Sequence, residues 1–189
     1  YSILIFVSVL YVNYNYLDSS IVDLRFTYTL IFSLAILFIG NFFGYVYLGD
    51  NGSYLLSFFI GIYLVSFFMS NNFLSPYYIA TILWYPSFEN FFSLIRRLLS
   101  KKSVSSADNN HFHQLLYSLV RNFKFFGRNI EFDNSFASVI ILIFNIPGFI
   151  ISSNNPLNTK IQIYIILINI TLYLIFYFLL LKKFKNKQP

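Results

Sequence analysis

The fold is decided by residues 161–181, which read IQIYIILINITLYLIFYFLLL. The stretch contains no charged residue, and its apolar side chains do not alternate with polar ones. A strand of an outer-membrane barrel would alternate over roughly 10 residues, whereas a helix needs roughly 20 mostly apolar residues to cross a bilayer. The stretch therefore predicts a transmembrane α-helix.

The composition extends this prediction to the whole chain. Of its 189 residues, 57% are hydrophobic, 22% aromatic and 11% charged, which leaves too little polar surface for a soluble globule. We expect an all-α, polytopic transmembrane bundle of about six spans, forming one integral membrane domain over residues 1–189. The spans are expected at 1–14, 26–47, 53–70, 77–95, 136–152 and 160–181. The first is short and begins without Met, so we expect the chain to be the C-terminal part of a longer protein.

The basic residues predict the orientation in the membrane. Eleven of the 13 Lys and Arg lie in residues 96–135 or 182–189, so the positive-inside rule makes both segments cytoplasmic. Because the chain changes sides at each span, residues 71–76, one span before the cytoplasmic segment 96–135, are expected outside. Residues 49–52, two spans before it, are expected to be cytoplasmic. The net charge of +6 is then explained by topology and by attraction to anionic lipid, and it requires no nucleic-acid partner.

A polar island, LGDNGS, interrupts the apolar sequence at residues 48–53. Gly49 and Gly52 allow a tight turn and the close approach of a ligand, and Asp50 offers a hard oxygen ligand for Mg²⁺. Ser53 and the amides that open the next helix can receive an anion. The alternative is that Gly-Asp-Asn-Gly is an ordinary turn between two helices.

A second polar island, DNNHFHQ at residues 108–114, contains both histidines of the chain. His111 and His113 share a face only in an extended or loop conformation, and there they can donate hydrogen bonds to phosphate. Asp108 can orient one of them, and the amphipathic run 113–126 is expected at the membrane interface. A zinc site would need further ligands, and the chain has no Cys. The alternative is two solvated loop histidines.

Glu89 lies inside the fourth expected span, where an ionisable side chain is costly and indicates a functional or bundle-interior position. Pro86 is expected to kink this helix. Arg96 and Arg97 follow, either as phosphate-binding residues or simply as the markers of the cytoplasmic helix end.

The order of these features resembles a known family of membrane enzymes. The matching stretches are LGDNGSYLL at 48–56, WYPSFE at 84–89, IRR at 95–97 and DNNHFHQL at 108–115. Together they resemble the motifs of the polyprenyl-phosphate N-acetylhexosamine-1-phosphate transferases, which are related to the phospho-MurNAc-pentapeptide translocase. The resemblance is specific over residues 41–117 and covers the rest only as hydrophobic spans.

The resemblance implies transfer of a sugar 1-phosphate from a UDP-N-acetylhexosamine to a polyprenyl phosphate such as undecaprenyl phosphate. The reaction would release UMP and start cell-envelope glycan synthesis at the cytoplasmic face of a bacterial inner membrane. Asp50 would be the residue of the Mg²⁺ or Mn²⁺ site, and His111 and His113 would act with it as catalytic residues. The substrate-binding residues would be Gly49, Asn51, Gly52, Ser53, Glu89, Arg96, Arg97 and Asp108.

Three departures from the family pattern stand beside the resemblance. The family's paired-aspartate and Asn-Asp-Gly motifs are absent and would precede Tyr1, so residues 1–189 alone are expected to be inactive. Gln114 stands where many members have a third histidine, and Glu89 stands where many have Asp. The alternative function is a catalytically silent membrane remnant or subunit that binds a lipid phosphate or partner helices. A channel or transporter is disfavoured, because the sequence has neither a buried charge series nor paired broken helices.

Overall fold

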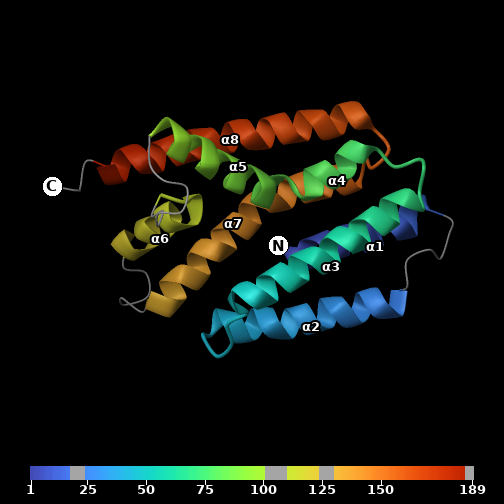
Figure 1. Ribbon diagram of the computed structural model, residues 1–189, viewed down its shortest axis with the longest axis horizontal. Helices are drawn as coiled ribbons and strands as arrows, with labels where there is room; N and C mark the ends of the chain where they lie inside the picture. Colours follow the sequence, from blue (N-terminus) through green and yellow to red (C-terminus); the bar gives the residue numbers. More distant parts are fainter. Residues whose placement is uncertain (18–23, 101–109, 124–129, 186–189) are drawn as a thin grey trace. The chain divides into compact units, whose positions relative to one another are not determined.

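The computed structural model describes residues 1–17, 24–100, 110–123 and 130–185. Within these residues the chain forms eight helices and no strand, which confirms the all-α prediction (Figure 1). The helices are α1 (Ser2–Tyr16), α2 (Leu24–Phe42), α3 (Gly49–Met69), α4 (Pro76–Ile82), α5 (Trp84–Leu99), α6 (Phe112–Phe123), α7 (Ile130–Ser153) and α8 (Thr159–Lys185).

Four helices in the described part of the chain are long and apolar enough to cross a membrane. They are α2, α3, the part of α7 from Phe132 to Ser153 and the part of α8 from Thr159 to Phe184. These match four of the six expected spans. The first expected span, residues 1–14, corresponds to α1, which is apolar but has only 15 residues.

The fourth expected span, residues 77–95, is wrong as a single helix. It is divided at Leu83, whose φ of −103° and ψ of 2° separate α4 from α5. Pro86 accounts for the break, because it has no amide hydrogen and its ring clashes with the carbonyl of Ile82 in a continuous helix. In the first turn of α5 the missing amide costs little, since amides there have no partner within the helix. The expected kink is therefore present as a break.

The connection between α2 and α3 also differs from the prediction. The expected turn at residues 49–52 is the first turn of α3, and the connection is formed by residues 43–48. Gly44, with φ +76°, ends α2 in a Schellman motif in which the Tyr45 amide donates to the Gly40 carbonyl at 2.8 Å. Gly49 has φ +66°, a value that glycine alone adopts readily.

The chain divides into two compact units. The first comprises Tyr1–Ile82 and Asn145–Ile165, and the second comprises Leu83–Phe144 and Ile166–Pro189. In the first unit, the Ser8 hydroxyl lies 2.7 Å from both the Tyr78 hydroxyl and the Ser153 hydroxyl. Such hydrogen bonds between helices help to hold helices together in an apolar solvent. They join α1 to α4 and to the end of α7.

The second unit has an aromatic-rich core to which α5, α6, α7 and α8 all contribute. Its buried members are Trp84, Phe112, Leu115, Leu116, Val120, Ala137, Ile141, Tyr173, Tyr177 and Leu180. Four of them belong to α6, so the apolar face of this helix packs against protein. The expected place of the run 113–126 at the membrane interface stays a prediction, and residues 124–126 of it lie outside the described residues.

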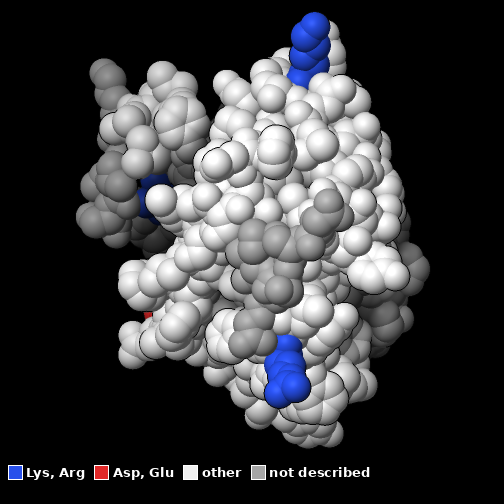
Figure 2. Space-filling model, turned by 90° about the vertical axis from the view of Figure 1, so that its right-hand side faces the viewer, with Lys and Arg blue, Asp and Glu red and all other residues white. Residues whose placement is uncertain are grey.

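Large apolar side chains also cover much of the protein surface. Phe32 on α2, Phe58 on α3 and Leu179 on α8 are between 60% and 68% exposed. Figure 2 shows a face on which charged side chains of the described residues are few. Exposed apolar surface of this extent is typical of protein that lies in lipid.

Candidate functional site

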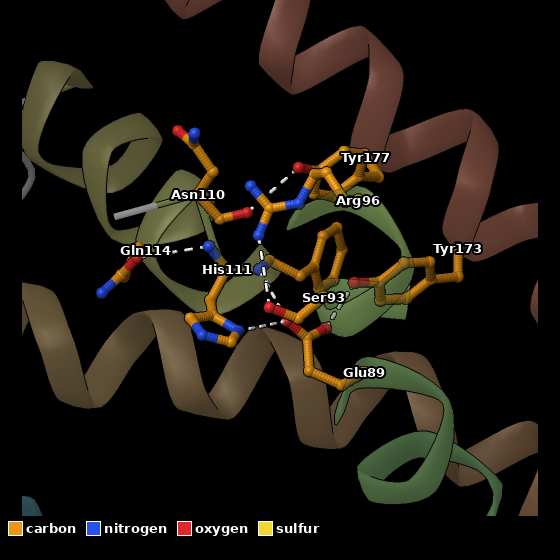
Figure 3. A network of polar contacts seen from close by, with 9 residues as sticks. Glu89, Ser93, Arg96, Asn110, His111, Gln114, Tyr173 and Tyr177 are labelled. Carbon is orange, nitrogen blue, oxygen red and sulfur yellow. Dashed lines mark hydrogen bonds and ion pairs between the residues drawn. The ribbon is translucent and has the colours of Figure 1, made fainter. Parts of the chain in front are cut away.

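Glu89 is the centre of a hydrogen-bonded cluster in the second unit (Figure 3). The residue is only 9% exposed, and it lies in the second turn of α5. Its Oε1 atom accepts hydrogen bonds from the Phe112 amide at 3.0 Å and from Nδ1 of His111 at 3.1 Å. Its Oε2 atom accepts a hydrogen bond from the hydroxyl of Tyr173. Three donors thus offset the cost of burying this carboxyl group among apolar residues.

The first turn of α6 explains why His111 and Phe112 face Glu89. His111 caps this helix, because its carbonyl accepts the amides of Gln114 at 3.0 Å and Leu115 at 3.1 Å. The side-chain oxygen of Gln114 in turn accepts the His111 amide at 3.2 Å, as in the second half of a capping box. The Glu89 carboxylate adds negative charge at the positive end of the helix dipole.

The two imidazole rings lie beside each other. Their centroids are 5.7 Å apart and their planes are inclined by 20°. His111 precedes α6 and His113 lies in its first turn, so the two rings lie side by side although only His111 is outside the helix. Loss of water around the ring lowers the pKa of His113, and the neighbouring His111 lowers it further. His113 is therefore predominantly neutral at pH 7.

Arg96 and Arg97 lie in the last turn of α5, where positive charge favours the helix dipole. Both arginines thus lie at a helix end, and a role of theirs in phosphate binding stays a prediction. Arg96 also stacks on α8, with its guanidinium carbon 5.9 Å from the ring centre of Tyr177. The Tyr177 hydroxyl donates to the carbonyl of Asn110 at 3.1 Å, so α8 contacts the backbone immediately before His111.

Asp50 belongs to the first unit, in the first turn of α3, and it is exposed. Its carbonyl accepts the hydroxyl of Ser53 at 2.9 Å, so Ser53 lies inside the helix. The amides at the start of α3 are consequently those of Gly49, Asn51 and their neighbours. This corrects the expectation that Ser53 opens the helix. Gly52 packs against Leu48, whose Cγ would lie 2.9 Å from a Cβ at this position.

Asp50 is the residue expected to bind the metal ion, and it is among the described residues. Mg²⁺ commonly takes one or two carboxylates together with phosphate oxygens and water, and the exposed carboxylate of Asp50 fits that requirement. No group of three His, Asp or Glu that could hold a metal ion occurs in the described part of the chain. Asp50 and the histidines lie in different units, and their convergence stays a prediction. Asp108 lies outside the described residues, and Glu89 orients His111 in the role expected of Asp108.

Two site residues were not predicted from the sequence, and both are on α8. Tyr173 and Tyr177 are one turn apart, and both are almost fully buried. The signal that could have indicated them is the presence, within an apolar span, of two tyrosines four positions apart, because residues at this spacing lie on one face of a helix. Comparisons of the chain with protein-family models, with curated proteins and with solved structures found no match.

Proposed function

We propose that the chain is part of an integral membrane transferase that moves a sugar 1-phosphate from a UDP-sugar to a polyprenyl phosphate. The donor is a UDP-N-acetylhexosamine, and UMP is the leaving product. The reaction takes place at the cytoplasmic face of a bacterial inner membrane. The order of the sequence motifs supports this proposal, and four long apolar helices support the membrane setting.

The observation that carries the proposal is the contact between Glu89 and His111. The two residues are 22 positions apart and come from two separate motifs of the resemblance. Their side chains meet at 3.1 Å within the second unit, where Glu89 is buried and His111 is partly exposed. Motifs that belong to one reaction site are expected to converge in this way, whereas unrelated loop residues are not.

The Glu89–His111 pair has the chemistry that phosphoryl transfer requires of a positioning group. Glu89 accepts a hydrogen bond from Nδ1–H of His111, and this keeps the ring hydrogen on Nδ1. A held imidazole is better suited to contact a phosphate oxygen than one that samples several orientations. His113, neutral and stacked beside it, supplies a second imidazole that can donate a hydrogen bond to phosphate.

The remaining proposed residues would offset the negative charge of the substrates' phosphate groups. Asp50 would hold Mg²⁺ or Mn²⁺, whose charge offsets that of the donor diphosphate and of the leaving UMP. Arg96 and Arg97 would add positive charge toward the phosphates. Because positioning and electrostatics dominate the rate of phosphoryl transfer, these groups need not form a covalent intermediate.

The test is product formation by the full-length protein in native-like lipid. With undecaprenyl phosphate, Mg²⁺ and a UDP-N-acetylhexosamine, it should release UMP and form a lipid-linked diphosphate sugar. Omitting the lipid phosphate or chelating the metal should each abolish release. A protein that binds the lipid phosphate but releases no UMP from any UDP-sugar would favour the alternative, a catalytically silent membrane subunit.

A further inference from the structure

We propose that Tyr173, in the last helix, is a positioning residue for the histidine pair. In this arrangement its hydroxyl holds one oxygen of Glu89, and the other oxygen of Glu89 fixes the tautomer of His111. Tyr173 lies outside residues 41–117, over which the motifs resemble the transferases. The effect on turnover rests on the proposed function, whereas the effect on the tautomer of His111 does not.

The carboxyl group of Glu89 is held at both of its oxygens. Glu89 uses its two oxygens differently: Oε1 faces His111 and the Phe112 amide, and Oε2 faces the Tyr173 hydroxyl. Donors at both ends prevent rotation of the carboxyl group about its terminal bond, a torsion that is otherwise broad. Without the hydroxyl, Oε2 would be a buried acceptor lacking this donor, and the orientation of Oε1 toward His111 would be less restricted.

Tyr173 is itself rigidly held. It is 0% exposed, and six aromatic rings lie around it. They belong to Trp84, Tyr85, Phe88, Phe92, Phe112 and Tyr177, with centroids between 4.8 and 6.5 Å from that of Tyr173. Four of these rings lie on α5, which also carries Glu89. A ring enclosed in this way has little freedom, so its hydroxyl is a fixed point from which Glu89 can be oriented.

Helix α8 also contacts the segment around His111 at a second point. Tyr177, one turn after Tyr173 and stacked parallel to it, donates to the carbonyl of Asn110. The side chain of His111 and the backbone just before it are thus both linked to α8, the first through Glu89 and the second directly. The two tyrosines therefore act on His111 in different ways. Tyr177 fixes the position of its backbone, and Tyr173, through Glu89, fixes the orientation of its ring.

The experiment is ¹⁵N NMR of the full-length protein with labelled histidine, in lipid at pH 8. The His111 signals are identified by their loss in His111→Gln. In the wild type His111 should be a single tautomer with the proton on Nδ1. In Tyr173→Phe it should exchange between two tautomers. Tyr164→Phe makes the same chemical change at an exposed position of α8, and it should give the wild-type spectrum.

A double-mutant cycle shows whether the hydroxyl acts through the carboxylate. Glu89→Gln should produce mixed tautomers by itself, and adding Tyr173→Phe should change the spectrum no further. Glu89→Asp serves as a second variant if Tyr173→Phe does not retain the fold. The shorter side chain cannot reach Tyr173 and His111 together, so mixed tautomers are expected there also.

Turnover provides the readout that rests on the proposed function. Tyr173→Phe should lower kcat about tenfold or more and change KM for the UDP-sugar less than about twofold. The reason is that the variant loses the fixed position of the His111 ring but keeps the groups that bind the UDP-sugar. A single Nδ1 tautomer in folded Tyr173→Phe, or in Glu89→Asp, would overturn the proposal. A wild-type protein without turnover but with the expected tautomers would refute the proposed function and leave the positioning role intact.

Discussion

Nδ1 of His111 lies 3.1 Å from Oε1 of Glu89, and this oxygen also accepts the amide that opens α6. One carboxyl group therefore orients an imidazole and caps a helix at once. Helix α6 and the ring of His111 are positioned by the same group on α5. Any change to Glu89 is expected to affect both the stability of the second unit and the site.

Glu89→Gln should destabilise the protein by about 1–3 kcal/mol, because it breaks a buried network and places two amide hydrogens where three donors converge. Thermal unfolding in detergent, followed by helical circular dichroism, measures this effect. Asp50→Asn is the matched control, since it makes the same acid-to-amide change at an exposed residue. The control should unfold at the wild-type temperature. Equal unfolding temperatures for Glu89→Gln and the wild type would contradict the network.

Gln114→Ala should weaken the start of α6 by about 1 kcal/mol, because the His111 amide loses its side-chain acceptor. Amide hydrogen exchange at residues 111–115 should become faster. Turnover should fall much less than in His113→Ala. Asn122→Ala, an exposed change near the other end of α6, should leave exchange at residues 111–115 unaltered. Unchanged exchange in Gln114→Ala would show that the capping contact contributes nothing.

The pH dependence of stability should include a contribution from His113. Its folded pKa lies below the ordinary value of 6.5, so between these two values the unfolded chain binds more protons than the folded one. Stability from this residue is therefore present above about pH 6.5 and decreases as the pH falls through that window. His113→Gln should reduce the loss of unfolding temperature between pH 7.5 and pH 5.5. The same loss in variant and wild type would exclude this role.

The membrane topology depends on the broken pair α4 and α5. If this pair crosses the bilayer, residues 43–48 and the end of α5 share the cytoplasmic side. If only the four long helices cross, residues 43–48 share a side with the connection between α7 and α8 instead. Single cysteines can be introduced without background, because the chain has none. Labelling of Tyr45→Cys, Leu99→Cys and Leu157→Cys distinguishes the two topologies, since all three positions are exposed.

We expect Tyr45→Cys and Leu99→Cys to react from the cytoplasmic side and Leu157→Cys from the outside. This is the outcome that allows Asp50 and the histidines to serve one site. Reaction of Tyr45→Cys and Leu157→Cys from the same side would place Asp50 away from the histidines and would remove it from the proposed site.

The sequence was sufficient for the parts of the fold and site that depend on strong local signals. Long apolar runs such as residues 161–181 predicted the helices. Glu89 and the histidines were singled out because an ionisable group is unusual in so apolar a chain. The start of α3 was missed, because the sequence Gly-Asp-Asn-Gly is also typical of turns. In the structure Asp50 lies in the first turn of α3, where its negative charge interacts favourably with the helix dipole.

Tyr173 was missed for a different reason. A tyrosine within an apolar span is counted as one more hydrophobic residue, and its hydroxyl acquires a role only when a carboxyl group from another helix meets it. The contact joins positions 84 residues apart, and no local pattern encodes such a distance. The same limitation applied to the contact between Glu89 and His111, which joins positions 22 residues apart.

Exchange of labelled UMP into a UDP-N-acetylhexosamine, catalysed by the full-length protein in native-like lipid with Mg²⁺, measures the proposed transfer itself. We expect exchange that depends on polyprenyl phosphate. Asp50→Asn, which keeps the shape of the side chain but removes its charge, should lower the exchange rate by at least ~10²-fold. No exchange by the wild type with any UDP-sugar, or an Asp50→Asn rate equal to that of the wild type, would refute the transferase function.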